Sequence, residues 1–246
     1  MDYEKNYVFG QHAVKTLVIN DPGRILNLWC QAERYSELEF YLRKRSNIKV
    51  QIVPKKTIEG LVPGVNHQGF LAELMVGDYT ETEYHLEEMV ESLGDELKLL
   101  ILDGVEDPHN LGACLRTACA LGINGVIIPK NKACGITNTV YKVASGAVGE
   151  ISIFRVVNLA RTIDYLKKCG IWVYGAAENG EVDLGKLKFH KPWALVFGNE
   201  GFGMRRLTRD KCDVVFKIPM KHKLVSSLNV SVAVGVGLYM ATISND

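Results

Sequence analysis

From Leu97 onward, short apolar runs alternate with stretches in which apolar residues recur at helical spacing. Runs of Ile, Val and Leu bounded by turn residues predict strands that are covered on both faces. The predicted strands are 99–102, 125–128, 151–156, 171–174, 194–197 and 214–218. The predicted helices are 110–121, 137–147, 159–168 and 226–243. This alternation predicts a parallel sheet in an α/β fold.

The first 77 residues carry a shorter, mixed pattern that predicts a small α/β unit. Its predicted helices are 11–18 and 36–45, and its predicted strands are 25–29, 49–53 and 69–76. The stretch that follows is acidic and polar, as is typical of a linker, with an amphipathic helix near 86–93. We therefore expect a first domain over 1–77, a linker over 78–95 and a second domain over 96–246.

Composition is that of an ordinary globular protein: of 246 residues, 47% are hydrophobic and 23% are charged. The formal net charge is only +1, so any nucleic-acid contact must come from local basic clusters. Such clusters lie at 43–45, 55–56, 205–211 and 217–223. The ordinary explanation of each single cluster is a solvated helix or loop surface.

The six cysteines contain no CxxC pair and no zinc-binding spacing, which favours buried, reduced thiols and no metal. The N-terminus lacks the apolar core of a signal peptide. The most apolar stretch, 225–243, is broken by Ser, Asn and Gly, and is too weak for a membrane span. We therefore expect a cytoplasmic protein without a membrane partner.

The first of three motifs, 103–118, starts at the end of a predicted strand and opens a predicted helix. Asn110 is placed to cap that helix. Leu111, Cys114 and Leu115 belong to its apolar stripe, and Arg116 falls beside the stripe. A surface arginine whose stem lies along apolar neighbours is the ordinary explanation of Arg116.

In the second motif, 193–204, a strand runs into a turn that contains Gly198, Glu200, Gly201 and Gly203. Glycines at the end of a strand let a ligand approach the backbone. Their order, G-x-x-G-x-G, differs from the dinucleotide-binding order G-x-G-x-x-G, and no P-loop Lys-Ser/Thr follows. A nicotinamide cofactor or a nucleoside triphosphate is therefore disfavoured. Taken alone, Glu200 could serve only a helix dipole.

The third motif, 218–233, joins Ile218-Pro-Met220 to the polar start of the last predicted helix through a charged loop. Ser226 or Ser227 can cap that helix. Asn229 lies in its first turn and needs partners, because burying it unpaired costs roughly 1–3 kcal/mol. Either the backbone amides that Asn229 caps or a contact within a functional site could supply these partners.

Together, in this order and spacing, the three motifs resemble the SpoU family of RNA ribose 2′-O-methyltransferases, within the SPOUT class. Segments 9–14 and 66–69 resemble the small substrate-binding domain that precedes many such catalytic domains, so the likeness spans nearly the whole chain. It implies an α/β fold in which a C-terminal domain with a parallel sheet and a deep trefoil knot follows a small α/β substrate-binding domain. It also implies a homodimer in which each active site draws on both subunits.

The resemblance implies methyl transfer from S-adenosylmethionine, without a metal, to a guanosine ribose in the peptidyl-transferase loop of 23S rRNA. By the same likeness, the catalytic positions are Asn110, Arg116, Glu200, Ser227 and Asn229. The cofactor positions are Gly198, Glu200, Ile218, Met220, Leu228 and Asn229. One departure is the loop 221–224, which lacks the family's glycine and is one residue longer. Either Ser226 or Ser227 therefore matches the family's serine.

Methyl transfer is an in-line displacement, so the main task is to align the ribose oxygen with the methyl carbon. The 2′-hydroxyl must lose its proton, which calls for a base or for cations near the developing oxyanion. The family's arginine has been assigned the base role, yet arginine stays protonated in proteins. An RNA phosphate could instead take the proton while Arg116 stabilises charge. Asn110 and Glu200 would then orient Arg116.

The first domain would select the RNA, with basic residues at 43–45 and 55–56 contacting phosphates. Tyr35, Phe40 and Tyr41 either belong to the core or stack on splayed bases. Two alternatives share the motifs: a tRNA methyltransferase of the same family, and an RNA-binding ribosome assembly factor without activity. Retention of the motif residues favours an enzyme.

Overall fold

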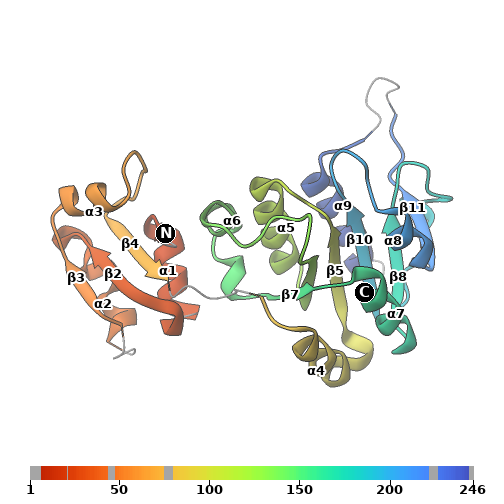
Figure 1. The fold of residues 1–246 in the computed structure, drawn as a ribbon, viewed down its shortest axis with the longest axis horizontal. Helices are drawn as coiled ribbons and strands as arrows, with labels where there is room; N and C mark the ends of the chain where they lie inside the picture. Colours follow the sequence, from red (N-terminus) through yellow and green to blue (C-terminus); the bar gives the residue numbers. More distant parts are fainter. Residues whose placement is uncertain (1–6, 21, 44–47, 75–79, 222–226, 244–246) are drawn as a thin grey trace. The chain divides into compact units, whose positions relative to one another are not determined.

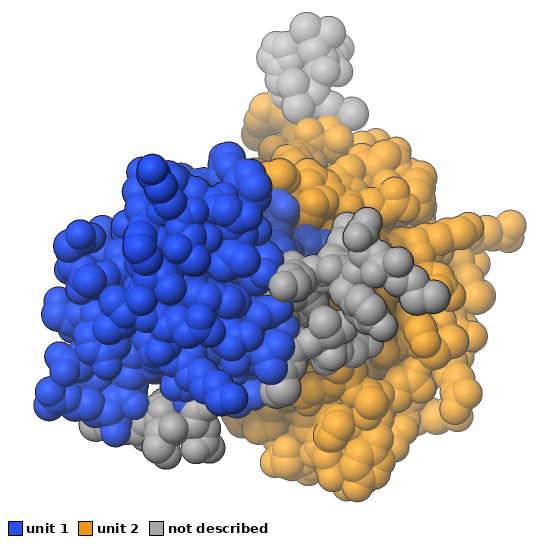
Figure 2. Space-filling model, turned by 60° about the vertical axis from the view of Figure 1, so that its left-hand side comes forward, with its two compact units in different colours: residues 1–78, 137–150 blue, residues 79–136, 151–246 orange. Residues whose placement is uncertain are grey.

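The computed structural model describes residues 7–20, 22–43, 48–74, 80–221 and 227–243. By their contacts, the residues divide into two compact units, which Figure 2 colours separately. The first combines 1–78 with 137–150, and the second combines 79–136 with 151–246. Segment 137–150 lies between two strands of the second unit in the sequence, yet its helix contacts β1 (Tyr7–Phe9) of the first.

The first unit is built on a four-stranded mixed sheet with the order β1-β4-β2-β3. Strand β4 (Phe70–Leu74) runs antiparallel to β1 and to β2 (Ile25–Cys30), and β3 (Val50–Ile52) runs parallel to β2. Its helices are α1 (Gln11–Asn20), α2 (Ser36–Leu42), α3 (Lys55–Leu61) and α6 (Asn138–Ala144). One of its core clusters consists of Tyr7, Trp29, Ile58, Val62 and Leu71.

The predicted elements of the first 77 residues are present, with shifted ends. The helix predicted over 36–45 ends at Leu42, and residues 44 and 45 lie outside the described residues. The strand predicted over 69–76 is described as far as Leu74, and 75–76 also lie outside. The short elements β1 and α3 were not predicted, because three and seven residues carry too little periodicity to separate them from loops.

The second unit confirms the predicted parallel sheet. Its seven strands all run parallel, in the order β7-β6-β5-β10-β8-β11-β9 (Figure 1). The strands are β5 (Lys98–Asp103), β6 (Gly125–Pro129), β7 (Ser152–Val156), β8 (Trp172–Ala176), β9 (Val182–Asp183), β10 (Trp193–Gly198) and β11 (Val214–Lys217). The helices are α4 (Glu83–Leu93), α5 (Pro108–Ala120), α7 (Leu159–Lys168), α8 (Arg206–Lys211) and α9 (Val230–Ile243).

Both faces of this sheet are covered, which explains the uninterrupted apolar runs of its strands. Leu86 of α4 and Ile163 of α7 belong to one core cluster with Val196 of β10. On α9, a Cβ at Gly237 would lie 2.6 Å from the ring of Phe197, so the helix packs closely against β10. The stretch 78–95, predicted as a linker, contains α4 with buried Leu86, while residues 78 and 79 lie outside the described residues.

The strand order determines which segments can form a site. Strand β10 lies between β5 and β8, and β11 lies on the far side of β8. The carboxyl ends of β5, β8, β10 and β11 therefore meet at one edge of the sheet, although they are far apart in the sequence. The resemblance implies a C-terminal trefoil knot, and residues 222–226 of that part of the chain lie outside the described residues.

Candidate active site

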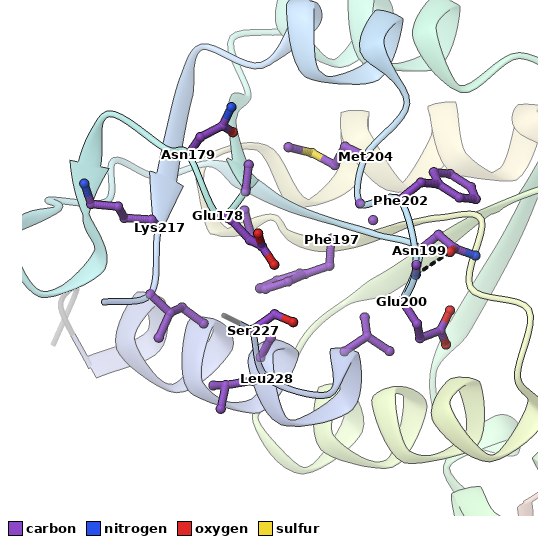
Figure 3. Close-up of a pocket in the computed structure, with 18 of the residues that line it drawn as sticks. Glu178, Asn179, Phe197, Asn199, Glu200, Phe202, Met204, Lys217, Ser227 and Leu228 are labelled. Atoms are coloured by element: carbon purple, nitrogen blue, oxygen red, sulfur yellow. Dashed lines mark hydrogen bonds between the residues drawn. The ribbon is translucent and has the colours of Figure 1, made fainter. Parts of the chain in front are cut away.

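A pocket of about 800 Å³ opens at the carboxyl edge of the second unit's sheet (Figure 3). Its walls come from the segments that follow β8, β10 and β11 and from the start of α9. Ligands of parallel α/β folds bind at this edge, because loops from several strands converge there. The predicted cofactor positions that line the pocket are Gly198, Glu200, Ile218, Met220 and Leu228. Ser227 lines it too, whereas Asn229 lies just beyond the lining.

Gly198 is a position where no side chain fits. A Cβ built there would lie 2.0 Å from the carbonyl carbon of Gly203 and from the amide nitrogen of Met204. The chain therefore folds back directly over the end of β10, and backbone rather than side chain forms this wall of the pocket. The second motif needs this glycine for a close backbone approach.

The turn after Gly198 is fixed by its own hydrogen bonds. The backbones of Asn199 and Gly203 exchange two hydrogen bonds of 3.0 Å. The side chain of Asn199 donates to the carbonyl of Gly104 at 2.8 Å and accepts from the amide of Gly201 at 2.7 Å. These bonds join the turn after β10 to the end of β5.

An ion pair between a buried carboxylate and a half-buried guanidinium supports the same turn. The carboxylate of Asp103, which is fully buried at the end of β5, accepts a 2.8 Å hydrogen bond from the backbone of Arg205. Its second oxygen lies 3.3 Å from the guanidinium of Arg205. Sequence reasoning missed this pair, because the two residues are 102 positions apart and only the strand order brings them together.

Three predicted catalytic side chains form one chain of hydrogen bonds beside the pocket. The amide of Asn110 donates to the carboxylate of Glu200 at 2.7 Å. The amide of Asn229 donates to the carbonyl oxygen of Asn110 at 3.0 Å. Residues from the three motifs thus meet at a single point, with Asn110 buried at its centre.

The role of Asn110 as a helix cap was predicted wrongly. Helix α5 begins at Pro108, and its cap is Asp107, whose carboxylate accepts a 2.9 Å hydrogen bond from the amide of His109. Proline suits the first helical position, since it lacks the amide proton that would remain unpaired there. Asn110 therefore lies inside the first turn, and its side chain is available for Glu200 and Asn229.

Asn229 rather than a serine caps the last helix, so that prediction was wrong as well. Its side-chain oxygen accepts hydrogen bonds from the backbone amide of Ser231 at 2.9 Å and from the Ser231 hydroxyl at 2.6 Å. Ser227 precedes the helix as an exposed residue of the pocket wall, and Ser226 lies outside the described residues. The side chain of Asn229 thus combines a cap with the bond to Asn110.

Arg116 is exposed on α5. Hydrogen bonds join Asn110 to Glu200 and to Asn229. Two residues before Arg116, burial raises the pKa of the Cys114 thiol to about 12, with the negative charge of Glu200 as a smaller cause. Glu200 precedes α8 by several residues, so it does not serve that helix's dipole.

The end of the pocket farther from Glu200 contains polar groups that the sequence analysis did not predict. Glu178 and Asn179 follow β8, and Figure 3 shows the Glu178 carboxylate directed into the pocket near Phe197 and Ser227. Arg209 of α8 donates to the side chain of Asn179 at 2.7 Å. The sequence signal that could have identified them is their position, since both polar residues follow directly after an apolar strand.

The basic cluster 205–211 and the six cysteines differ in part from the surroundings that the sequence predicts for them. In the 205–211 cluster, Arg205 pairs with Asp103 and Lys211 with Asp164 at 2.8 Å, so much of this charge is used within the chain. All six cysteines are free thiols, but only Cys30 and Cys114 are buried, whereas Cys119, Cys134 and Cys212 are half-buried and Cys169 is exposed. Within the described residues, no cluster of three or more His, Cys, Asp or Glu could hold a metal ion. In the same part of the chain, no helix is long and apolar enough to cross a membrane.

Comparisons with known proteins cover both units. Residues 98–239 match the SpoU rRNA Methylase family, and residues 7–75 match the RNA 2′-O ribose methyltransferase substrate-binding family. The 23S rRNA (guanosine-2′-O-)-methyltransferase RlmB of Xylella fastidiosa is 42% identical over 98% of this chain and 97% of its own length. The enzyme of that name from Photobacterium profundum is 43% identical over 95% and 96%.

A solved structure agrees in fold. The SpoU methyltransferase AviRb of Streptomyces viridochromogenes, in complex with the cofactor AdoMet, superimposes with a TM-score of 0.79 at 21% identity. The alignment covers 98% of this chain and 90% of AviRb.

Proposed function

This chain belongs to the SpoU rRNA methylase family, and from that premise we propose that it transfers a methyl group from S-adenosylmethionine to the 2′-hydroxyl of a guanosine in 23S rRNA. The observation that carries the proposal is the hydrogen-bond chain Glu200–Asn110–Asn229 at the edge of the pocket. Polar side chains from three distant segments converge there, next to a space large enough for a nucleoside-sized ligand.

The pocket fits the cofactor by its backbone wall, its apolar surface and its hydrogen-bond acceptor. The backbone wall at Gly198 permits close approach, while Ile218, Met220 and Leu228 supply apolar surface. At the end of the pocket farther from Glu200, Glu178 can accept hydrogen bonds from the hydroxyl or amino groups of the cofactor. When bound, S-adenosylmethionine supplies an electrophilic methyl group on a sulfonium. The residues of this chain then have to bind it, exclude water and position the ribose oxygen.

We assign the hydrogen-bond chain to positioning of the ribose. Glu200 fixes the orientation of the Asn110 amide, and the cap at the start of α9 fixes Asn229. Because these side chains are already oriented, they need no reorganisation when the reaction occurs. This preorganisation is the main source of catalysis by positioning. Arg116 stabilises the negative charge that develops on the 2′-oxygen, and an RNA phosphate takes the proton, since arginine stays protonated.

We propose that Arg116 completes the site of a second subunit in a homodimer. The family resemblance implies shared active sites, and α9 offers a surface for the contact. Along one face it exposes four apolar side chains at helical spacing, namely Val232, Val236, Tyr239 and Ile243. Such a stripe on a helix is typical of an interface between proteins. Helix α5, which carries Arg116, packs directly against α9.

The first unit is proposed to select the RNA, in keeping with its match to a substrate-binding family. Arg43 and Lys55 are well exposed and form surface ion pairs, with Glu39 at 2.8 Å and with Glu59 at 3.3 Å. Surface pairs contribute little, so these cations can exchange them for RNA phosphates. Phe40 is 63% exposed, and we propose that its ring stacks on a base. We place the activity in the cytoplasm, where bacterial rRNA is made.

The direct test maps 2′-O-methyl groups on RNA from cells with and without the gene. We expect one guanosine of the 23S peptidyl-transferase loop to lose its methyl group when the gene is deleted. Re-expression of the wild-type chain should restore it, and the Arg116→Ala variant should not. Loss of a tRNA methyl group with the 23S rRNA unchanged would show that the chain acts on tRNA instead.

A further inference from the structure

Phe202 is an aromatic residue placed at the border of the pocket. Its side chain is 61% exposed, at the tip of the turn 199–203 and between two glycines. Single exposed apolar residues are common on protein surfaces. Phe202 differs from them because its turn is held by hydrogen bonds and because it lines the pocket in which we propose that methyl transfer occurs.

The backbone that carries Phe202 is held in place by the hydrogen bonds already described. Asn199 and Gly203 pair on either side of it, and the Asn199 side chain joins the turn to Gly104. The ion pair of Arg205 with Asp103 follows directly after the turn. Because the backbone of the turn is already hydrogen-bonded, packing of a flat ligand against the ring does not add the cost of ordering that backbone.

The ring also lies on the side of the turn where RNA is expected. In Figure 3, the side chains of Phe202 and Glu200 both extend from the turn away from the pocket's centre, into which Glu178 points. Glu200 starts the hydrogen-bond chain that we assign to positioning of the ribose. A nucleotide whose ribose lies beside Asn110 would therefore bring its base near Phe202.

We propose that Phe202 is the surface on which the target nucleobase stacks during methyl transfer; this inference rests on the proposed function. Proteins that modify or read single-stranded RNA commonly stack splayed bases on aromatic rings. The contact would hold the base and thereby limit the movement of the attached ribose. Phe202 is thus a substrate-positioning residue, distinct from the residues that bind the cofactor.

The test is a thermodynamic cycle that removes the Phe202 ring and the target base, separately and together. Methyl transfer is measured for the wild type and for Phe202→Ala, with a 23S rRNA fragment that holds the target guanosine and with the same fragment carrying an abasic ribose there. With the guanosine, we expect kcat/KM of Phe202→Ala to fall about 5- to 150-fold, the range of typical stacking contributions. With the abasic RNA, the wild type and the variant should have the same, lower kcat/KM.

Two further variants separate stacking from simple apolar contact and from folding. Phe202→Trp should retain the wild-type rate, whereas Phe202→Leu should resemble the alanine variant. The matched control is Trp172→Ala, which removes a ring that is 44% exposed at the opposite, amino end of β8. It should leave kcat/KM unchanged with both RNAs.

Cofactor affinity by calorimetry and oligomeric state by sedimentation complete the test, and neither should change in Phe202→Ala. Weaker binding of S-adenosylmethionine would assign the ring to the cofactor pocket, and dissociation would assign it to a subunit contact; either overturns the inference. An equal loss with both RNAs would overturn it as well. A wild-type chain that methylates no RNA would refute the proposed function together with this inference, whereas an active wild type matched by Phe202→Ala would refute this inference alone.

Discussion

The amide of Asn110 donates a 2.7 Å hydrogen bond to the carboxylate of Glu200, a residue 90 positions later in the sequence. This bond ties the first turn of α5 to the turn that closes over Gly198. Hydrogen bonds to a charged group contribute more than neutral ones, and a buried amide that loses its partner is costly. The bond therefore joins the first and second motifs structurally.

Breaking this bond from either side should have the same consequence. We expect Asn110→Ala and Glu200→Ala each to lower the single-turnover rate of methyl transfer about 10- to 150-fold, the equivalent of one charge-assisted hydrogen bond. Because the two side chains act together, the double variant should be little slower than either single variant. Single-turnover assays with 23S rRNA measure all three. Effects that multiply in the double variant would show that the residues act independently.

Two inactive variants should complement each other if Arg116 serves the neighbouring subunit. Arg116→Ala alone and Glu200→Ala alone should each have little activity. A heterodimer of the two variants, purified with two different tags, has one site in which both residues are intact. Its rate should therefore be about half that of the wild-type dimer. A heterodimer as slow as its parents would place Arg116 in the site of its own chain.

Gly198→Ala should remove cofactor binding, because its Cβ would meet the backbone of Gly203 and Met204 at 2.0 Å. The turn has to move away, with an expected loss of about 1–3 kcal/mol in the free energy of unfolding. Gly185→Ala is the matched control, since a Cβ there meets nothing within 4 Å. Calorimetry with S-adenosylmethionine and urea unfolding measure both effects. Wild-type affinity in Gly198→Ala would disprove the role of this backbone wall.

The sequence pattern predicted the second unit's larger elements because their periodicity is long. The apolar stripe of α5 and the continuous apolar runs of β5 and β10 needed no tertiary information. Short polar helices such as α8, with six residues, offered no such signal. The division into units also differs from a simple chain order, since 137–150 groups with the first unit.

Site residues were predictable where a motif contained them and not elsewhere. The motifs contain Asn110, Glu200 and Asn229, whose side chains the structure brings together, but the cap of α5 was assigned to Asn110 because several residues near its start have capping side chains. The pair of Asp103 with Arg205 depends on β10 lying next to β5. Glu178 reaches the pocket because β8 lies between β10 and β11. Such contacts follow from topology, which local patterns do not specify.

Alkaline conditions should destabilise the protein through its buried thiols. Burial raises the pKa of Cys114 to about 12 from a model-peptide value near 9, so the folded state holds this proton more tightly than the unfolded state. The resulting stabilisation is complete below pH 9 and is lost as the pH rises toward 12. Urea unfolding between pH 7 and pH 11 should show a smaller decrease for Cys114→Ala than for the wild type. Cys169→Ala, which removes an exposed thiol, is the control. Equal pH dependence in all three proteins would contradict the burial of Cys114.

The central claim is that the segments after β8, β10 and β11 form one pocket that presents a sulfonium methyl group to an RNA ribose. A crystal structure of the full chain soaked with S-adenosylmethionine tests it most directly. We expect the cofactor between the Gly198 turn and Leu228, with its methyl group facing the side chains of Glu200 and Asn110. A cofactor bound elsewhere, or none bound at saturating concentration, would contradict the account.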